Sequence, residues 1–379
     1  MRGVIDPTRL YLNKVSAMRI PGPWLSRLCR VNIGNLLRFP LLRRPGDPGL
    51  ETGRKDKRRD SSSGFCWRNN SFVLAGLLMT AGVFFGVAGA ADGKLTWAGC
   101  GISKNAFMAE MAAAYEKKTG VKIDFQGGGA TKGIREVSKR KVDIGGTCRH
   151  LIEDPASMLN HPEERRVQLT PVAWDALVAI VHKDNPVSTI TLDQIRRLYT
   201  GKLTNWKELG GHDAPIELYV RKGKISGVGR TKRELIFHNY EQEFVAKYVM
   251  DSSGPLERAI QENPNGVGMT GVSSARKLGS SAKILMLEGK EASYENIKNG
   301  QYMLYRPLYM VTHLQDSNPE VKKFLVFVMG EGGKKVMRSV GTVPYEDAIW
   351  LWLKYLDAQN KALAVRLASP KTTGRAPRL

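Results

Sequence analysis

Residues 121–134 read VKIDFQGGGATKGI, and this stretch decides the fold class. Its first five residues alternate between apolar and polar side chains, which predicts a short strand over 121–125. Three consecutive glycines and the polar pair Thr131-Lys132 follow, so we expect a loop over 127–133 and a helix from Ile134. A strand that leads through a glycine-rich loop into a helix is typical of α/β proteins.

The same pattern occurs on both sides of this stretch. A strand over 95–98 precedes a small-residue loop at 99–103 and an amphipathic helix over 106–118, which ends before Gly120. A third strand over 142–145 leads into Gly146-Thr147-Cys148-Arg149. Ligands of open α/β sheets bind outside the carboxyl ends of strands, where glycine leaves backbone N–H groups accessible to anions. The three loops therefore predict an anion site.

The remaining pattern is also that of an α/β protein. The apolar strands and amphipathic helices that we expect further along are strands over 177–181, 218–220, 266–272 and 307–312, and helices over 193–199 and 321–329. A basic, glycine-rich loop is expected over 221–231, directly after one of these strands.

The front of the chain has the features of an export signal. Residues 71–90 carry no charge, and Ala88 and Ala90 occupy the −3 and −1 positions of an A-x-A cleavage site. We therefore predict a cleaved signal peptide at 69–91 and a periplasmic protein. Residues 1–68 are expected to be a disordered or misannotated upstream segment. A permanent membrane anchor and a genuine cytoplasmic extension remain the alternatives.

The positive charge does not indicate a nucleic-acid partner. The formal net charge is +22, but residues 1–70 contain 15 Lys/Arg and 5 Asp/Glu, so nearly half of the excess lies before the expected cleavage site. The rest is spread along the chain rather than concentrated in one stretch. With export expected as well, we predict no nucleic-acid partner.

No catalytic or cofactor motif is present. The sequence lacks G-x-x-x-x-G-K-[ST] and G-x-S-x-G, and its six histidines are scattered without a metal-binding spacing. We therefore expect a protein that is not an enzyme, with no catalytic residue, no cofactor and no metal.

A set of ordered landmarks resembles one known family, the substrate-binding proteins of phosphate-type ABC transporters, which have the type II periplasmic binding fold. The landmarks are FQGGG at 125–129 with 132–134, VDIG at 142–145 with Arg149, LDQI at 192–195, GKLTNW at 201–206, LGG at 209–211, NGVG at 265–268, YRPLY at 305–309, Gly333, Gly341 and Val343-Pro344.

The resemblance implies two α/β lobes that are joined by two crossovers and clamp a ligand between them. Lobe 1 would comprise 92–175 plus 306–348, and lobe 2 would comprise 176–305, followed by a C-terminal helix and basic tail at 349–379. It also implies a monomer that delivers its ligand to an ABC permease in the inner membrane.

The ligand-binding residues are likewise those that the resemblance implies. Carried over by position, they are Gly101, Ile102, Ser103, Ala130, Thr131, Lys132, Thr147, Cys148, Arg149, Arg221, Gly229, Arg230 and Thr231. Ala130, Cys148 and Gly229-Arg230 stand where the family often has hydroxyl or carboxylate side chains. Because cations replace hydroxyls, we expect a small oxyanion, with phosphate favoured. The alternative is a sensing or surface binding protein of the same fold for another small anion.

Two cysteines remain after the expected cleavage, because Cys29 and Cys66 precede it. The resemblance places Cys100 and Cys148 in loops that leave neighbouring strands, and export favours oxidation, so we predict a disulfide between them. Two reduced thiols lining the cleft, or a soft-metal site that includes His150, remain the alternatives.

Overall fold

The computed structural model describes residues 93–154 and 159–368. The expected signal peptide at 69–91, the upstream segment 1–68 and the basic tail from residue 369 lie outside the described residues. Within the described part of the chain, no helix is long and apolar enough to cross a membrane.

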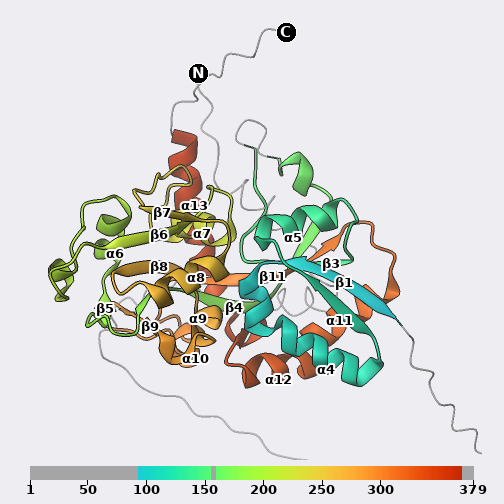
Figure 1. Cartoon of the computed structure of the whole chain (residues 1–379). Helices are drawn as coiled ribbons and strands as arrows, with labels where there is room; N and C mark the ends of the chain where they lie inside the picture. The colour runs from blue at the N-terminus through green and yellow to red at the C-terminus, as the bar shows by residue number, and fades with distance from the viewer. Residues whose placement is uncertain (1–92, 155–158, 369–379) are drawn as a thin grey trace, which may run out of the picture. The chain divides into compact units, whose positions relative to one another are not determined.

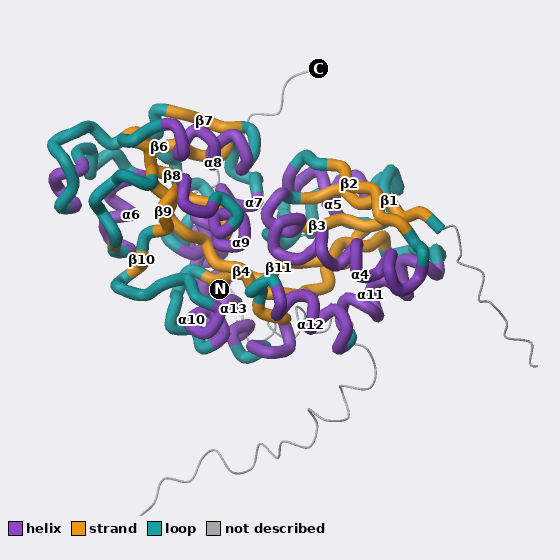
Figure 2. The backbone as a smooth tube through the Cα atoms, turned by 60° about the horizontal axis from the view of Figure 1, so that its bottom comes forward, coloured by secondary structure: helices purple, strands orange, loops and turns teal. Residues whose placement is uncertain are grey.

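Ten strands of the described residues form one sheet (Figures 1 and 2). Eight of them follow the spatial order β2-β1-β3-β11-β4-β8-β6-β7, and β12 and β9 pair with β4. The bounds are β1 Lys94–Gly99, β2 Lys122–Gln126, β3 Ile144–Thr147, β4 Val167–His182, β6 Glu217–Arg221, β7 Tyr248–Met250, β8 Gly266–Gly271, β9 Ala282–Ile284, β11 Tyr305–His313 and β12 Val343–Pro344. A separate pair is formed by β5 Thr189–Ile190 and β10 Met286–Leu287.

Strand β4 belongs to both halves of this sheet. Its residues 167–176 pair with β11, whereas its residues 177–182 pair with β8 and β9. The chain leaves the first half through β4 and returns at the start of β11, where the Leu177 N–H donates to the Leu304 carbonyl at 2.8 Å. We call the half with β1, β2, β3 and β11 lobe 1, and the half with β6, β7 and β8 lobe 2.

Helices cover the strands of both lobes. Figure 1 shows α5 on one side of the lobe 1 strands and α4 and α11 on the other, with α7, α8 and α9 among the strands of lobe 2. The α-helices are α3 Gly101–Ser103, α4 Ala109–Thr119, α5 Gly129–Ser138, α6 Leu192–Tyr199, α7 Gly227–Leu235, α8 Ser253–Glu262, α9 Val272–Arg276, α10 Tyr294–Lys298, α11 Pro319–Met329, α12 Glu331–Ser339 and α13 Leu351–Ala368. A π-helical segment, Lys104–Met108, joins α3 to α4.

The expected α/β class is confirmed, but two expected loops are wrong. Helix α5 begins at Gly129 rather than Ile134, because Gly128 adopts φ +130° and turns the chain directly from β2 into the helix. Helix α7 begins at Gly227 and continues through the whole second half of the expected 221–231 loop. In both places the residues expected in a loop form the first turn of a buried helix, with their backbone N–H groups at its N-terminus.

Candidate functional site

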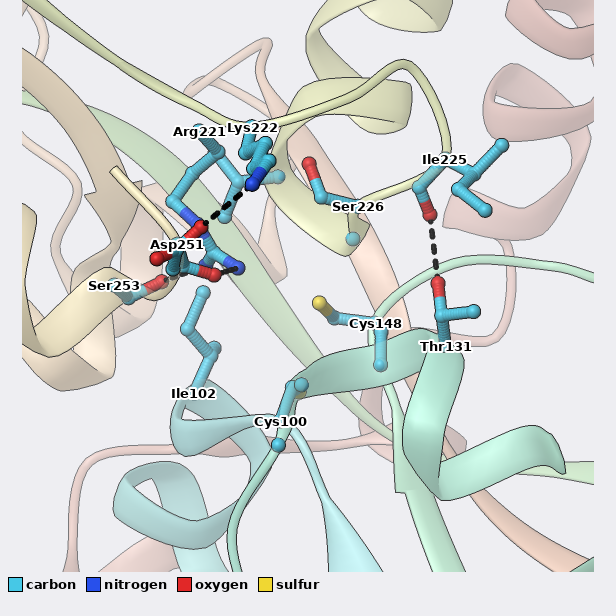
Figure 3. Close-up of a pocket in the computed structure, with 15 residues that line it drawn as sticks. Cys100, Ile102, Thr131, Cys148, Arg221, Lys222, Ile225, Ser226, Asp251 and Ser253 are labelled. Carbon is cyan, nitrogen blue, oxygen red and sulfur yellow. Dashed lines mark hydrogen bonds and ion pairs between the residues drawn. The ribbon is translucent and has the colours of Figure 1, made fainter. Parts of the chain in front are cut away.

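A cavity of about 210 Å³ lies between loops and helix starts of the two lobes (Figure 3). Lobe 1 contributes the start of α3, the start of α5 and the end of β3, and lobe 2 contributes the ends of β6 and β7 and the starts of α7 and α8. The lining residues are Cys100, Ile102, Gly128, Gly129, Ala130, Thr131, Cys148, Arg221, Lys222, Ile225, Ser226, Gly227, Val228, Asp251 and Ser253.

Three helices of nine or ten residues, α5, α7 and α8, start at this cavity. Their N-cap residues are Gly128, Ser226 and Ser252, and none of these makes a side-chain capping bond to the first turn. The backbone N–H groups of a first turn have no partner within the helix, and the helix dipole adds a partial positive charge there. Three uncapped N-termini thus make the cavity attractive to an anion.

Arg221, at the end of β6, adds a full positive charge to the lining. Its Nη1 donates to the Ser253 hydroxyl at 2.8 Å and its Nη2 to the Asp251 carbonyl at 2.9 Å. The Nε–H has no hydrogen-bond partner among the described residues. Burial lowers the pKa of Arg221 from its ordinary value, and nearby Cys148 and Cys100 oppose that shift. The guanidinium is therefore held in place while part of its donor capacity stays unused.

Arg149, the other arginine expected at the ligand, does not line the cavity. It is 1% exposed and forms a two-point ion pair with Glu164, Nη1 to Oε2 at 3.0 Å and Nη2 to Oε1 at 2.8 Å. Its other three N–H groups donate to the Ile225 carbonyl at 2.9 Å, the His150 carbonyl at 2.8 Å and the Thr131 hydroxyl at 3.1 Å. All five donors are occupied, so this side chain connects the lobes instead of presenting a charge to the cavity.

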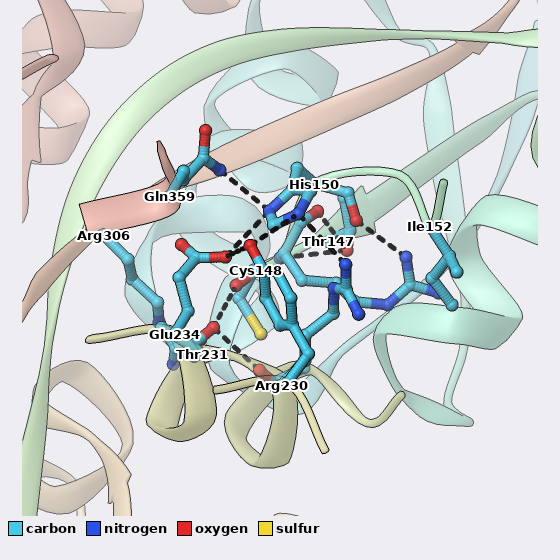
Figure 4. A network of polar contacts seen from close by, with 12 residues as sticks. Thr147, Cys148, His150, Ile152, Arg230, Thr231, Glu234, Arg306 and Gln359 are labelled. Carbon is cyan, nitrogen blue, oxygen red and sulfur yellow. Dashed lines mark hydrogen bonds and ion pairs between the residues drawn. The ribbon is translucent and has the colours of Figure 1, made fainter. Parts of the chain in front are cut away.

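Arg230 also points elsewhere, although its helix begins at the cavity. Its guanidinium stacks 4.0 Å above the Tyr240 ring and lies 3.4 Å from His150 Nε2. Figure 4 shows the surrounding network, in which His150 Nδ1 lies 3.2 Å from Glu234 Oε2 and 2.9 Å from Gln359 Nε2. This network joins the loop after β3 to α7 and α13. Among the described residues, no three histidine, cysteine, aspartate or glutamate side chains form a group that could hold a metal ion.

The other expected residues divide between the lining and its support. Of the residues that the resemblance implies at the ligand, Ile102, Ala130, Thr131, Cys148 and Arg221 line the cavity, whereas Gly101, Ser103, Lys132, Thr147, Gly229 and Thr231 do not. The Thr231 hydroxyl, for example, lies 2.8 Å from the Gly227 carbonyl and 3.2 Å from the Cys148 carbonyl, so it ties α7 to the loop after β3.

Cys100 and Cys148 are buried free cysteines, so the expected disulfide is not formed in this structure. Cys100 caps α3: its Sγ accepts the Ser103 N–H at 3.3 Å and lies 3.0 Å from the Ser103 hydroxyl. Cys148 faces Gly227, where any side chain would collide with its sulfur. The reduced sulfurs therefore each have a defined neighbour at the cavity wall.

Below the cysteines, the sheet holds a buried ion pair that sequence reasoning did not assign to the site. Arg306 of β11 and Asp175 of β4 are paired in register and fully buried, with Nη2 3.4 Å from Oδ2. A charged residue inside an otherwise apolar strand, as in YRPLY, was the signal that could have indicated it. Asp251 and Ser253 were also missed, because they follow a short strand that no sequence pattern marked.

Comparisons with known proteins agree with this architecture. Two lobes that share one sheet and enclose a polar cavity define a solute-binding protein of the type II periplasmic binding class. The model of the PBP superfamily domain matches residues 87–331. The chain belongs to the PBP superfamily.

Several similar proteins are named for phosphate binding or phosphate transport. The phosphate-binding protein PstS of Bacillus subtilis (strain 168) is 26% identical over 262 residues, which cover 68% of this chain and 82% of the relative. A crystal structure of a putative phosphate ABC transporter substrate-binding protein with bound phosphate, from Clostridium perfringens, is 29% identical with a TM-score of 0.59, and covers 66% of this chain and 99% of its own. An ABC-type phosphate transport receptor from Vibrio cholerae is 26% identical with a TM-score of 0.51, again over 66% and 99%.

Proposed function

We propose that this protein captures a small oxyanion, inorganic phosphate first, in the cavity between its lobes and delivers it to the permease of an ABC transporter. The observation that carries the proposal is the convergence of three uncapped helix N-termini on a cavity that also contains Arg221. Hydrogen bonds from charged donors to an anion contribute roughly 1.5–3 kcal/mol each, about twice a neutral bond. The names of the relatives support phosphate as the first candidate.

The biological setting is part of the same proposal. The protein acts outside the cytoplasm after removal of the segment ending near Ala90, as a monomer and without catalysing a reaction. The ligand is released to the permease when the lobes separate, because the residues that line the cavity come from both. No nucleic acid takes part in this role.

The lining also bears on selectivity among anions. Thr131, Ser226 and Ser253 supply hydroxyl groups, whereas Ala130 and Cys148 occupy positions where neither a hydroxyl nor a carboxylate is available. Asp251 contributes to the lining an exposed carboxylate, 3.5 Å from Lys222 Nζ, that accepts a hydrogen bond from a protonated oxyanion but repels a fully ionised one. We therefore expect phosphate to bind more tightly than sulfate.

Titration calorimetry of the purified protein with phosphate and with sulfate tests the proposal. Arg221→Ala removes a partly buried charged donor and is expected to weaken phosphate binding by more than tenfold. Arg258→Ala is the matched control, because it removes the same charge from an exposed position on α8, whose first residue lines the cavity. An unchanged dissociation constant in Arg221→Ala, or no heat of binding with either anion in the unaltered protein, would contradict the assignment.

A further inference from the structure

Two thiols belong to the wall of the proposed anion cavity. Cys100 follows β1 and Cys148 follows β3, and these strands are parallel neighbours, with Gly99 in register with Gly146. The ladder continues past the strand, because the Cys100 N–H donates to the Gly146 carbonyl at 3.1 Å. Neighbouring strands lie about 4.8 Å apart, within reach of the Cα separation of roughly 4.4–6.8 Å that a disulfide requires. Both side chains line the cavity, and Figure 3 shows the Cys148 sulfur pointing into it.

The surroundings of Cys100 favour a thiolate. Its sulfur interacts with the Ser103 N–H, the Ser103 hydroxyl and the thiol of Cys148. Burial alone would raise the pKa of Cys100, but the bonds from Cys148 and Ser103 and the charge of Arg306 outweigh burial and lower the pKa to about 6. The proton is retained by Cys148, whose pKa is raised well above the ordinary value by its hydrogen bond to Cys100 and by burial.

The charged groups that interact with the pair are Arg306, Arg221, Arg149 and Asp175. Arg306 is fully buried, its Nε has no partner among the described residues, and its contacts with Asp175 and Thr231 are both 3.4 Å long. A buried cation with such long contacts has capacity left to stabilise a negative charge beside it. At neutral pH that charge is the Cys100 thiolate.

A thiolate in the wall of an anion cavity opposes the ligand. Like charges a few ångströms apart repel strongly where water is excluded. The thiolate also offsets part of the positive charge of Arg306, which would otherwise attract the anion. Converting the two thiols to a disulfide removes this negative charge and leaves the arginines in place. The oxidised cavity is then more positive than the reduced one.

We propose that Cys100 and Cys148 form a redox-active pair that controls the affinity of the cavity for its anion, which binds tightly to the disulfide form and weakly to the dithiol form. This inference rests on the proposed function, since it concerns the same cavity. It assigns to the pair a regulatory role in place of a purely structural bond.

The oxidant in this proposal is a peroxide, which is small enough to enter the cavity of about 210 Å³ and reach the two thiols. The Cys100 thiolate attacks one oxygen of hydrogen peroxide, the O–O bond breaks, and hydroxide leaves as Cys100 becomes a sulfenic acid. The Cys148 sulfur then attacks the Cys100 sulfur, an S–S bond forms and the S–OH bond breaks. The departing hydroxide takes the Cys148 proton and leaves as water. The hydroxide from the first step takes up the proton that Cys100 released on forming the thiolate, so in total two thiols are oxidised and one peroxide is reduced to two waters.

The experiment compares anion binding by the two redox forms of one protein. Cys29→Ser and Cys66→Ser leave Cys100 and Cys148 as the only cysteines. Calorimetry at pH 8 with phosphate and with sulfate, a dianion of constant charge, is performed after treatment with dithiothreitol and after treatment with hydrogen peroxide. Mass spectrometry confirms the loss of two hydrogens in the oxidised sample.

We expect the oxidised form to bind sulfate at least tenfold more tightly, which corresponds to about 1.4 kcal/mol. Cys100→Ser removes the charge without oxidation, so it should bind as tightly as the disulfide form and be insensitive to peroxide. Cys148→Ser, which retains Cys100, cannot form the disulfide, so mass spectrometry should find no loss of two hydrogens after peroxide treatment. Equal affinities of the two forms, or two free thiols after peroxide treatment, would overturn this inference alone. Absence of binding in both forms would overturn the proposed function and this inference with it.

Discussion

Replacing Arg149 by Met distinguishes a ligand-binding arginine from a structural one. The side chain is 1% exposed, its partner Glu164 is fully buried, and two bonds of 2.8 and 3.0 Å join them. Arg149→Met leaves the Glu164 carboxylate with the Ile152 N–H at 2.9 Å and the more distant Arg135 Nε at 3.5 Å. Removing one partner of a buried ion pair typically costs about 3–5 kcal/mol. For a folded part of about 270 residues that corresponds to a fall in Tm of about 5–9 °C.

Urea denaturation without added anion measures this loss, and calorimetry with phosphate measures binding by the folded variant. Arg166→Met is the matched control, because Arg166 is exposed and its loss should change the free energy of unfolding by less than about 0.5 kcal/mol. Adding Glu164→Gln to Arg149→Met should recover part of the stability, with a coupling energy of about 0.5–3 kcal/mol. Phosphate affinity should change far less than in Arg221→Ala.

The ion pair also predicts a pH dependence. Burial raises the pKa of Glu164, but its bonds with Arg149 and the Ile152 N–H outweigh burial and bring the pKa below the ordinary value. A lowered folded-state pKa contributes stability above the ordinary value of about 4.3, and this contribution is lost as the pH falls through the folded-state value. The difference in stability between the unaltered protein and Glu164→Gln should therefore narrow below about pH 4.

If Arg149→Met unfolds at the same urea concentration as the unaltered protein but no longer binds phosphate, Arg149 is a ligand and the structural role argued for it is refuted.

Two further predictions concern the packing of each lobe. A Cβ at Gly133 would lie 2.7 Å from the Gly146 carbonyl oxygen and 2.8 Å from the Ala98 carbonyl oxygen. Gly133→Ala should therefore lower the free energy of unfolding, measured in urea, by about 1–3 kcal/mol. Gly127→Ala is the control and should not lower it, because a Cβ at Gly127 would meet no atom. Lys232 is fully buried with its Nζ 3.0 Å from the Tyr199 hydroxyl, and burial brings its pKa well below the ordinary value. A lysine whose pKa is lowered on folding makes the stability of the protein rise with pH. Lys232→Met combined with Tyr199→Phe should therefore raise the free energy of unfolding measured in urea at pH 7, and raise it more at pH 6. An unchanged or lower free energy of unfolding would contradict this account.

The order of strands and glycine-rich turns was predictable from the sequence because local patterns determine it. The alternation over 121–125 and the apolar stretch 177–181 both correspond to strands, and Arg221 stands at the strand end where it was expected. The starts of α5 and α7 were not predictable from propensity, because glycine is a poor helix former inside a helix. At Gly129 the positive φ of +88° favours glycine. At Gly227 the close approach of the other lobe does so, because a Cβ there would meet the Cys148 sulfur and Ala130.

The direction of each arginine side chain depends on partners that no local pattern reveals. Arg149 turns away from the cavity because Glu164 is fully buried beside it, and Arg230 turns toward Tyr240. Arg221 stays at the cavity because the Asp251 carbonyl and Ser253, about thirty residues later, hold it there. Residue type and position along the chain predicted which cations lie near the site, but only the packing of distant elements determines which one faces a ligand.

Strand β4 pairs with strands of both lobes, and this affects the order in which the chain can fold during synthesis. The strands of lobe 2 lie within one continuous segment, from the second half of β4 to β10, so every strand partner they need has been synthesised before β11. Lobe 1 is different, because β11 lies between β3 and β4 and is made more than a hundred residues after both. Until β11 is synthesised, one edge of β3 and the first half of β4 lack their partner strand, and such exposed edges promote association between chains. The nascent chain therefore needs protection at lobe 1, the lobe it begins first and completes last.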